Sequence, residues 1–181
     1  APKRVGLIKS DNASPQGYGE VWHFFEQQLK YPITQISMNR LNDRTLDQFD
    51  VLILPPGYYS NFASKDSELL QWIRKGGRVI ALGSAVGAFE GHDSLSLQQK
   101  ENDEEEDTQN IAFAEEERND ISSAIYGSIY AVDVDTTHPL AFGYDKQYYS
   151  LKNSAVSYSF LDGGSFGKLP KNSKPLAGFS G

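Results

Sequence analysis

The clearest candidate for chemistry in this sequence is a glycine-flanked turn near the middle of the chain. Gly83 and Gly87 bracket Ala85 in a G-x-A-x-G pattern, directly after the apolar run 79–82, which is predicted to be a buried strand. With Cys or Ser in place of Ala85, the pattern would be a nucleophile elbow, a crowded strand-to-helix turn that exposes a catalytic side chain. The central side chain here is a methyl group, so the sequence predicts a degenerate elbow without its reacting atom. A plainer interpretation is that the two glycines permit close packing of a helix on a strand.

Ser84 is the other nucleophile that this turn could supply. If Ser84 were the central residue, its flanking positions would be Leu82 and Val86, whose side chains are too large for such a turn. This argues against Ser84, although a hydrolase that uses Ser84 or another residue at the turn remains an alternative. The chain has no cysteine, which excludes thiol nucleophiles, disulfides and thiolate metal sites.

Three histidines are the remaining residues with obvious chemistry: His23, His92 and His138. His23 and Glu26 lie one helical turn apart in an H-x-x-E spacing and could share a zinc ion. Two phenylalanines lie between them in an amphipathic helical pattern, however, so we expect His23 at the helix surface. No metal site is predicted in this chain.

His138 lies in the segment 135–143, which combines Asp, Thr and Pro residues. The structural interpretation is a turn in which Asp135 and a threonine hydroxyl bond to the local backbone while Pro139 fixes φ. A catalytic role for His138 would need an acid or base partner, which the sequence does not identify.

The elements that must position these residues alternate along the first half of the chain. Four runs are predicted as strands: 4–9, 33–38, 50–54 and 79–82. Three helical patterns lie between them: 18–30, 45–49 and a helix that begins with Ser64 as its N-cap and ends at Gly76. Such alternation predicts a parallel sheet wound by helices, in which ligands bind beyond the carboxyl ends of the strands. Three loops should converge there: 11–17, 55–62 and 83–87.

The helical pattern 18–30 gives a specific expectation about packing. Its apolar residues recur at helical spacing, so Val21, Trp22, Phe25 and Leu29 can share one face of the helix. Pro32 should stop the helix, because proline lacks the N–H that a continuing helix needs.

The pattern changes in the second half of the chain. The segment 91–110 contains the acidic run 101–107, which we expect to be a solvated, mobile insertion because its like charges repel and it has little to bury. Calcium binding is the alternative, but the run lacks the glycine and the alternation of a calcium loop. The segment 111–124 has helical character, whereas 127–134 and 155–160 alternate and predict strands of a small β-rich carboxyl-terminal segment.

Length and charge limit the possible functions. A chain of 181 residues suits a single domain over 1–181. The formal net charge of −7 argues against a nucleic-acid binder, and no apolar run is long enough to span a membrane. The abrupt beginning and end of the sequence suggest a piece cut from a longer protein.

Two sets of motifs carry a resemblance to known proteins. DVLILPPG at 50–57 and LQWIRKGGRVIALG at 70–83 resemble the class I glutamine amidotransferase-like superfamily. AEEER at 114–118, GSIY at 127–130 and DVDTTHPLAFG at 133–143 resemble the amidotransferase-like domain found downstream of the catalytic domain in bacterial M14 zinc carboxypeptidases. The resemblance implies an α/β fold with a three-layer, flavodoxin-like parallel sheet.

The resemblance also implies what the individual residues do. The cysteine of active amidotransferases falls on Ala85, and their downstream His-x-Glu pair has no match, because Pro139 and Leu140 follow His138. Gly57 falls where the superfamily places oxyanion-binding backbone. These positions imply a noncatalytic accessory domain of a zinc carboxypeptidase, with no cofactor of its own. The upstream catalytic domain would be its partner and would hold the zinc, and the location would be periplasmic or extracellular.

A small-ligand binding module is a further alternative. Its pocket would lie at the strand ends and would be formed by Gly57, Tyr58, Ser84 and Ala85. A polar, preformed pocket there favours ligand binding, whereas a pocket filled by Tyr58, Tyr59 or Phe62 favours the accessory domain.

Overall fold

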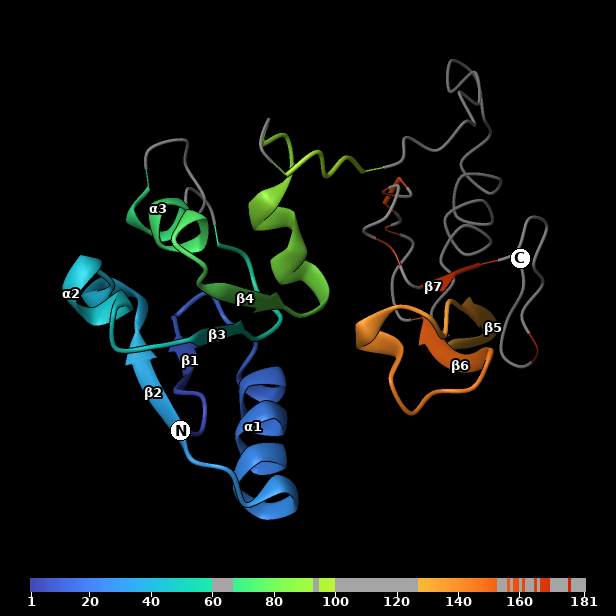
Figure 1. Ribbon diagram of the computed structural model, residues 1–181, viewed down its shortest axis with the longest axis horizontal. Helices are drawn as coiled ribbons and strands as arrows, with labels where there is room; N and C mark the ends of the chain where they lie inside the picture. The colour runs from blue at the N-terminus through green and yellow to red at the C-terminus, as the bar shows by residue number, and fades with distance from the viewer. Residues whose placement is uncertain are drawn as a thin grey trace, which may run out of the picture. The chain divides into compact units, whose positions relative to one another are not determined.

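The structure, a computed structural model, describes most of the first half of the chain and parts of the second. The described residues are 1–59, 67–92, 95–99, 127–152, 156, 158–159, 161, 165, 167–169 and 176. The chain divides into two compact units, Ala1–Ser96 and Leu97–Gly181, and each is described by itself (Figure 1). The sequence predicts one domain over 1–181, and that organisation stays a prediction.

The first unit is built on a four-stranded parallel sheet (Figure 1). Its strands are β1 (Val5–Lys9), β2 (Ile33–Ser37), β3 (Val51–Leu54) and β4 (Arg78–Ala81). The strand order is β2-β1-β3-β4, and Val5 is paired with Ile33 on one side and with Val51 on the other. This is the order of the first four strands in flavodoxin-like sheets, so the predicted α/β fold class is confirmed.

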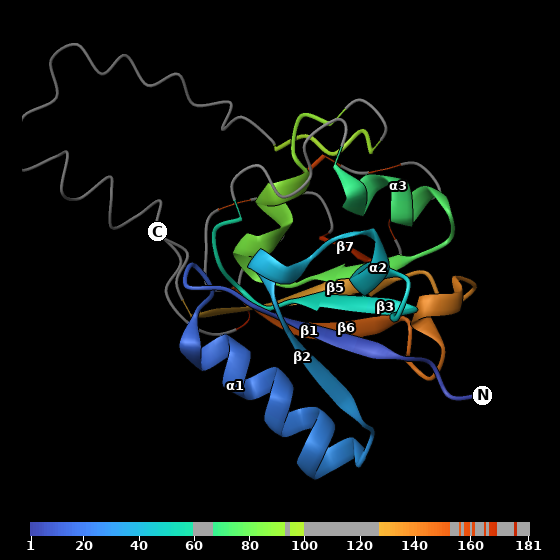
Figure 2. The same ribbon diagram turned by 90° about the vertical axis from the view of Figure 1, so that its left-hand side faces the viewer.

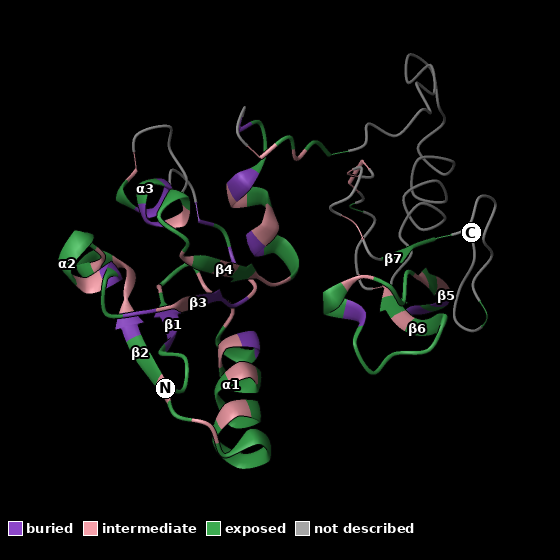
Figure 3. Ribbon diagram, in the orientation of Figure 1, coloured by how far each residue is buried: buried purple, intermediate pink, exposed green. Residues whose placement is uncertain are grey.

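The apolar runs of β1 and β3 form the centre of this sheet (Figure 3). Leu7, Leu52 and Leu54 are completely buried, as expected for parallel strands covered on both faces. In β4, by contrast, Ile80 is 46% exposed. The prediction of a fully buried strand at 79–82 is therefore wrong, because β4 is an edge strand of the described sheet and has a neighbour on one side only.

The first helix begins earlier than predicted. α1 (Pro15–His23) continues into the π-helical turn η1 (Phe24–Leu29), whereas the sequence pattern suggested 18–30. Ser14 is the N-cap, and its hydroxyl accepts a hydrogen bond from the Gly17 N–H at 3.2 Å. The Ser-Pro pair at the N-cap and first helical position is a known start signal that the apolar periodicity alone does not contain.

The predicted apolar face of this helix is buried only in part. Tyr18, Val21 and Phe25 pack against the core of β1 and β3, but Trp22 and Leu29 are 37% and 51% exposed. Trp22 lies beside the buried stripe, in edge contact with Tyr18. Leu29 leaves the stripe because π-helical winding advances more residues per turn than the α-helical period assumed.

Helices cover both faces of the sheet. Figures 1 and 2 show α1 on one side and α3 (Glu68–Arg74) on the other, so the predicted three layers are present. The short α2 (Asp43–Leu46) starts two residues before the predicted pattern, with a capping box between Asn42 and Thr45. The described part of α3 is capped by Ser67, whose hydroxyl accepts from the Leu70 N–H; the predicted cap, Ser64, lies outside the described residues.

Three 3₁₀-helical elements are also described: η2 (Met38–Arg40), η3 (Gly83–Phe89) and η5 (Pro139–Ala141). Within the described residues, every helix is too short or too polar to cross a lipid bilayer.

The second unit contains a small antiparallel sheet. Its strands are β5 (Ser128–Val134), β6 (Gln147–Lys152) and β7 (Gly167–Lys168), in the order β6-β5-β7. The predicted strand at 127–134 and the β-rich carboxyl-terminal segment are confirmed by it. The acidic run 101–107 and the helical pattern 111–124 lie outside the described residues. Half of the predicted strand 155–160 is described, and there Tyr158 forms an isolated antiparallel bridge with Gln99 and no strand.

Candidate functional site

The loops that follow β1 and β3 are clasped together at the carboxyl edge of the parallel sheet. The Ser14 N–H donates to the Pro56 carbonyl at 2.7 Å, and the Tyr58 N–H donates to the Asn12 carbonyl at 3.1 Å. Because both bonds join backbone to backbone, the two loops are held at a fixed separation. This part of the predicted convergence of loops is confirmed.

Gly57 lies in backbone contact with the loop that follows β1, where it forms a bridge with Ala13. A Cβ at this position would lie 2.5 Å from the Asn12 carbonyl oxygen and 2.8 Å from the Ala13 Cα. Gly17 has a similar role on α1, because its Cβ would lie 2.7 Å from the Pro56 ring. Only glycine fits where backbones approach this closely.

The loop that follows β4, residues 83–87, contacts the loop after β3 through Ser84. The Gly57 N–H donates to the Ser84 hydroxyl oxygen at 3.0 Å, so the amide for which the resemblance implies oxyanion binding already has an acceptor. Ser84 is exposed, and no acidic or basic side chain among the described residues is hydrogen-bonded to it. The contact therefore satisfies Gly57 and leaves Ser84 without the base that an activated serine needs.

Ala85 does not occupy the exposed centre of an elbow. A sharp turn follows β4 as predicted, but Ala85 is completely buried in η3 and its N–H donates to the Leu82 carbonyl at 3.1 Å. The left-handed backbone conformation of the turn falls on Gly83, with φ of +54°. The expected crowding at Gly87 is absent, because a Cβ there would meet only the Glu90 side chain, at an ordinary 3.6 Å.

The two tyrosines in the loop after β3, Tyr58 and Tyr59, differ in burial. Tyr58 is 79% exposed, whereas Tyr59 is 3% exposed and its hydroxyl donates to the Pro55 carbonyl at 2.9 Å. Burial raises the pKa of Tyr59 to about 12, so this phenol stays neutral at physiological pH. Tyr59 thus fills space beside the loops, which is the arrangement expected for an accessory domain; Phe62 lies outside the described residues.

The histidines of the first unit are not gathered around a common point. His23 and Glu26 are exposed near the end of the first helix, as expected for His23, and His92 is buried. Among the residues that the structure describes, no three His, Asp or Glu side chains are close enough together to hold a metal ion. The absence of a metal site from this chain stays a prediction.

His138 caps a turn in the second unit. The Asp135 carboxylate accepts hydrogen bonds from the hydroxyl and the N–H of Thr137, at 2.6 and 2.9 Å, and these bonds hold the pKa of Asp135 below its ordinary value. The Leu140 N–H donates to His138 Nδ1 at 3.2 Å, where η5 begins with Pro139. The segment is a turn in which Asp135 bonds to the local backbone, as predicted, but the Thr137 hydroxyl bonds to the Asp135 carboxylate and not to the backbone.

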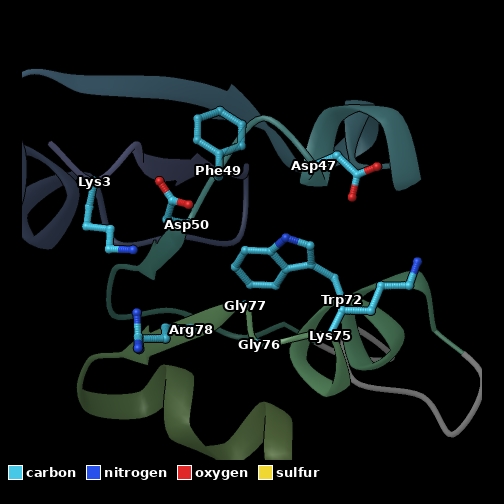
Figure 4. A pocket seen from close by; sticks show the side chains of 9 residues that line it. All are labelled: Lys3, Asp47, Phe49, Asp50, Trp72, Lys75, Gly76, Gly77 and Arg78. Atoms are coloured by element: carbon cyan, nitrogen blue, oxygen red, sulfur yellow. The ribbon is translucent and has the colours of Figure 1, made fainter. Parts of the chain in front are cut away.

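The candidate ligand-pocket residues, Gly57, Tyr58, Ser84 and Ala85, are not among those that line the pocket described next, and their role stays a prediction. A pocket of about 210 Å³ lies at the amino-terminal edge of the parallel sheet, where Lys3, Asp50 and Arg78 are among its lining residues (Figure 4). Sequence reasoning missed this group. A sequence signal for this group does exist. A charged residue stands just before β1 and β3 and at the first position of β4, and the parallel register of these strands brings their first positions side by side.

Replacing Ser84 by Ala should lower the free energy of unfolding of the first unit by about 1 kcal/mol, because the Gly57 N–H loses its acceptor. Urea unfolding followed by tryptophan fluorescence measures this, since both tryptophans lie in the first unit. Ser37→Ala is the control, because the Ser37 hydroxyl has no hydrogen bond among the described residues. An equal loss in both variants would show that the Ser84 contact has no specific role.

Comparisons with known proteins add little to this description. No family model and no curated protein matches the chain. Among solved structures, it is similar to a glutamine amidotransferase from Thermotoga maritima, with 8% identity and a TM-score of 0.48. The match covers 87% of this chain and 62% of that protein's length. The flavodoxin-like strand order of the first unit is established independently of this neighbour.

Proposed function

We propose that this chain is a noncatalytic, amidotransferase-like accessory domain of an M14-type zinc carboxypeptidase. The observation that carries the noncatalytic part is the arrangement at the carboxyl edge of the sheet, where Gly57, Ser84 and Ala85 meet; we call this arrangement the closed strand end. The Ser84 hydroxyl oxygen accepts a hydrogen bond from the Gly57 N–H, and Ala85 is completely buried.

Acyl-transfer chemistry needs two groups that are absent from this arrangement. A nucleophile must be exposed to the substrate and activated by a neighbouring base, and an oxyanion hole must present N–H groups that are free to donate hydrogen bonds to the developing oxyanion. At this turn the central residue has no reactive atom and the candidate amide is already hydrogen-bonded. We therefore infer that the strand end serves packing rather than turnover.

The carboxypeptidase part of the proposal is supported by the motifs at 114–118, 127–130 and 133–143. The last of these carries apolar side chains that are unusually exposed: Leu140 is 68% and Phe142 is 92% exposed. Exposed apolar residues in one short segment are typical of surfaces that pack against another domain. Interdomain packing, with presentation of the substrate to a separate zinc-containing domain, is the role that we assign to this chain.

The coding sequence on either side of this segment tests the parentage. We expect it to encode an upstream domain with a histidine, glutamate and histidine zinc set, and the full product to release carboxyl-terminal residues from peptides. A zinc chelator should abolish this activity, and Ser84→Ala in the full product should leave it unchanged. Flanking sequence without such a zinc set would overturn the carboxypeptidase assignment and leave the noncatalytic assignment untouched.

A hydrolase that uses Ser84 is the second candidate. It is favoured by one observation, the exposure of Ser84 at the carboxyl edge of the sheet, 3.0 Å from a backbone amide. A small-ligand binding module is the remaining alternative. It is supported by the exposure of Ser84 and of Tyr58 at this edge of the sheet.

A further inference from the structure

The pocket at the amino-terminal edge of the parallel sheet is separate from the strand end discussed above. Its walls come from residues at or just before the first positions of β1, β3 and β4, from the end of α3 and from Asp47 at the end of α2 (Figure 4). Its volume is about 210 Å³. A ligand of a few heavy atoms therefore fits.

The wall of this pocket formed by Trp72 is fixed by close packing. Trp72 is 6% exposed, and a Cβ on Gly77 would run into its indole ring. Gly76 has a φ of +102°, and the Gly77 N–H donates to the Trp72 carbonyl at 3.0 Å. The chain can pass this closely over the ring because Gly77 has no Cβ, and Gly76 allows the left-handed backbone conformation just before it.

Cations outnumber carboxylates at one end of the pocket. In Figure 4, the side chains of Lys3, Asp50 and Arg78 lie on the same side of the Trp72 ring. Arg4 already binds the Asp50 carboxylate, through its backbone N–H at 2.8 Å and its Nε at 3.3 Å. These bonds hold the pKa of Asp50 below its ordinary value, so this carboxylate is charged and paired at neutral pH.

Lys3 and Arg78 are not held in a close ion pair, although the charge of Lys3 also contributes to the lowered pKa of Asp50. Within the part of the chain that the structure describes, neither side chain forms an ion pair within 4.0 Å, and the ion pair found there is that of Arg4 with Asp50. At the end of α3, the N–H groups of Lys75, Gly76 and Gly77 close the helix by bonding to carbonyls one turn back, those of Gln71, Trp72 and Ile73. Two available cations therefore flank a small, fixed pocket in a chain whose net charge is −7.

We propose that this pocket binds a small oxyanion, of the carboxylate or phosphate type, between the Lys3 ammonium and the Arg78 guanidinium. The planar fork of an arginine matches two oxygens of either group, and a lysine adds a point charge. The binding site goes beyond the proposed function and is independent of it, because no residue of the clasped loops takes part.

Fluorescence of Trp72 tests the site directly. In a Trp22→Phe background, Trp72 is the single tryptophan of the chain. We expect a saturable change in its fluorescence on titration with sodium phosphate or sodium succinate, against sodium chloride at equal ionic strength. The dissociation constant should be on the order of 1 mM, and Lys3→Gln or Arg78→Gln should each weaken binding about tenfold.

Lys9→Gln is the matched control, because it removes the same charge at the opposite, carboxyl end of β1. Its affinity should equal that of the background protein. A response to phosphate alone or to succinate alone supports the site and identifies the oxyanion. No saturable change with either anion, or equal weakening by Lys9→Gln and Arg78→Gln, overturns the proposal. Lys3 is exposed and precedes β1, so Lys3→Gln keeps the test decisive if Arg78→Gln does not fold.

Discussion

Gly57→Ala should destabilise the first unit by about 3 kcal/mol, at the upper end of the usual cost of overpacking. The added Cβ would lie 2.5 Å from the Asn12 carbonyl oxygen and 2.8 Å from the Ala13 Cα. Both are backbone atoms, so no side-chain rotation can relieve the contact. The loops must separate, which strains the hydrogen bonds from Ser14 to Pro56 and from Tyr58 to Asn12.

Urea unfolding followed by tryptophan fluorescence measures this loss, because the two tryptophans report on the first unit. Gly19→Ala is the control. Gly19 lies inside α1, and a Cβ there would have nothing within 4 Å, so this variant should gain up to about 1 kcal/mol from better helix propensity. If Gly57→Ala unfolds at the same urea concentration as the parent protein, the loops are not clasped as described.

Gly77→Ala should cost about 2–3 kcal/mol for a different steric reason. Its Cβ would overlap the Trp72 indole ring, and Trp72 is too deeply buried to move aside without disturbing the packing of α3. The indole environment must change as well, so the fluorescence of the folded variant should shift. Equilibrium unfolding and the emission maximum before unfolding measure the two effects.

Gly76→Ala separates the steric cost from backbone strain. Gly76 has open space around it but a φ of +102°, so alanine there should cost only about 1–2 kcal/mol and should leave the emission of folded Trp72 unchanged. A Gly77→Ala variant no worse than Gly76→Ala, with an unchanged emission maximum, would refute the proposed contact with Trp72.

The layout of the first unit could be predicted from the sequence because its strands are short, apolar and separated by helical patterns. Those patterns dictate a wound parallel sheet, and a parallel sheet places successive loops at one edge. The errors occurred where tertiary context decides. The edge position of β4 leaves Ile80 exposed, and the π-helical turn moves Leu29 out of the buried face.

The roles of the glycines could not be predicted from the G-x-A-x-G pattern. The pattern drew attention to Gly83 and Gly87, yet it is Gly57 that lies in close backbone contact with another loop, because this contact depends on how two distant loops meet. The cationic pocket was missed for the same reason. Lys3 and Arg78 are far apart in the sequence, and the register of β1, β3 and β4 brings their ends together.

Hydrolysis by the purified chain is the most direct test of the noncatalytic assignment. Ammonia release from glutamine and product release from an activated ester should be measured for the chain and for its Ser84→Ala variant. If the strand end is noncatalytic, neither protein should hydrolyse either substrate faster than buffer alone does. Turnover by the parent chain that Ser84→Ala abolishes, while the variant remains folded, would contradict the noncatalytic assignment and establish Ser84 as a nucleophile.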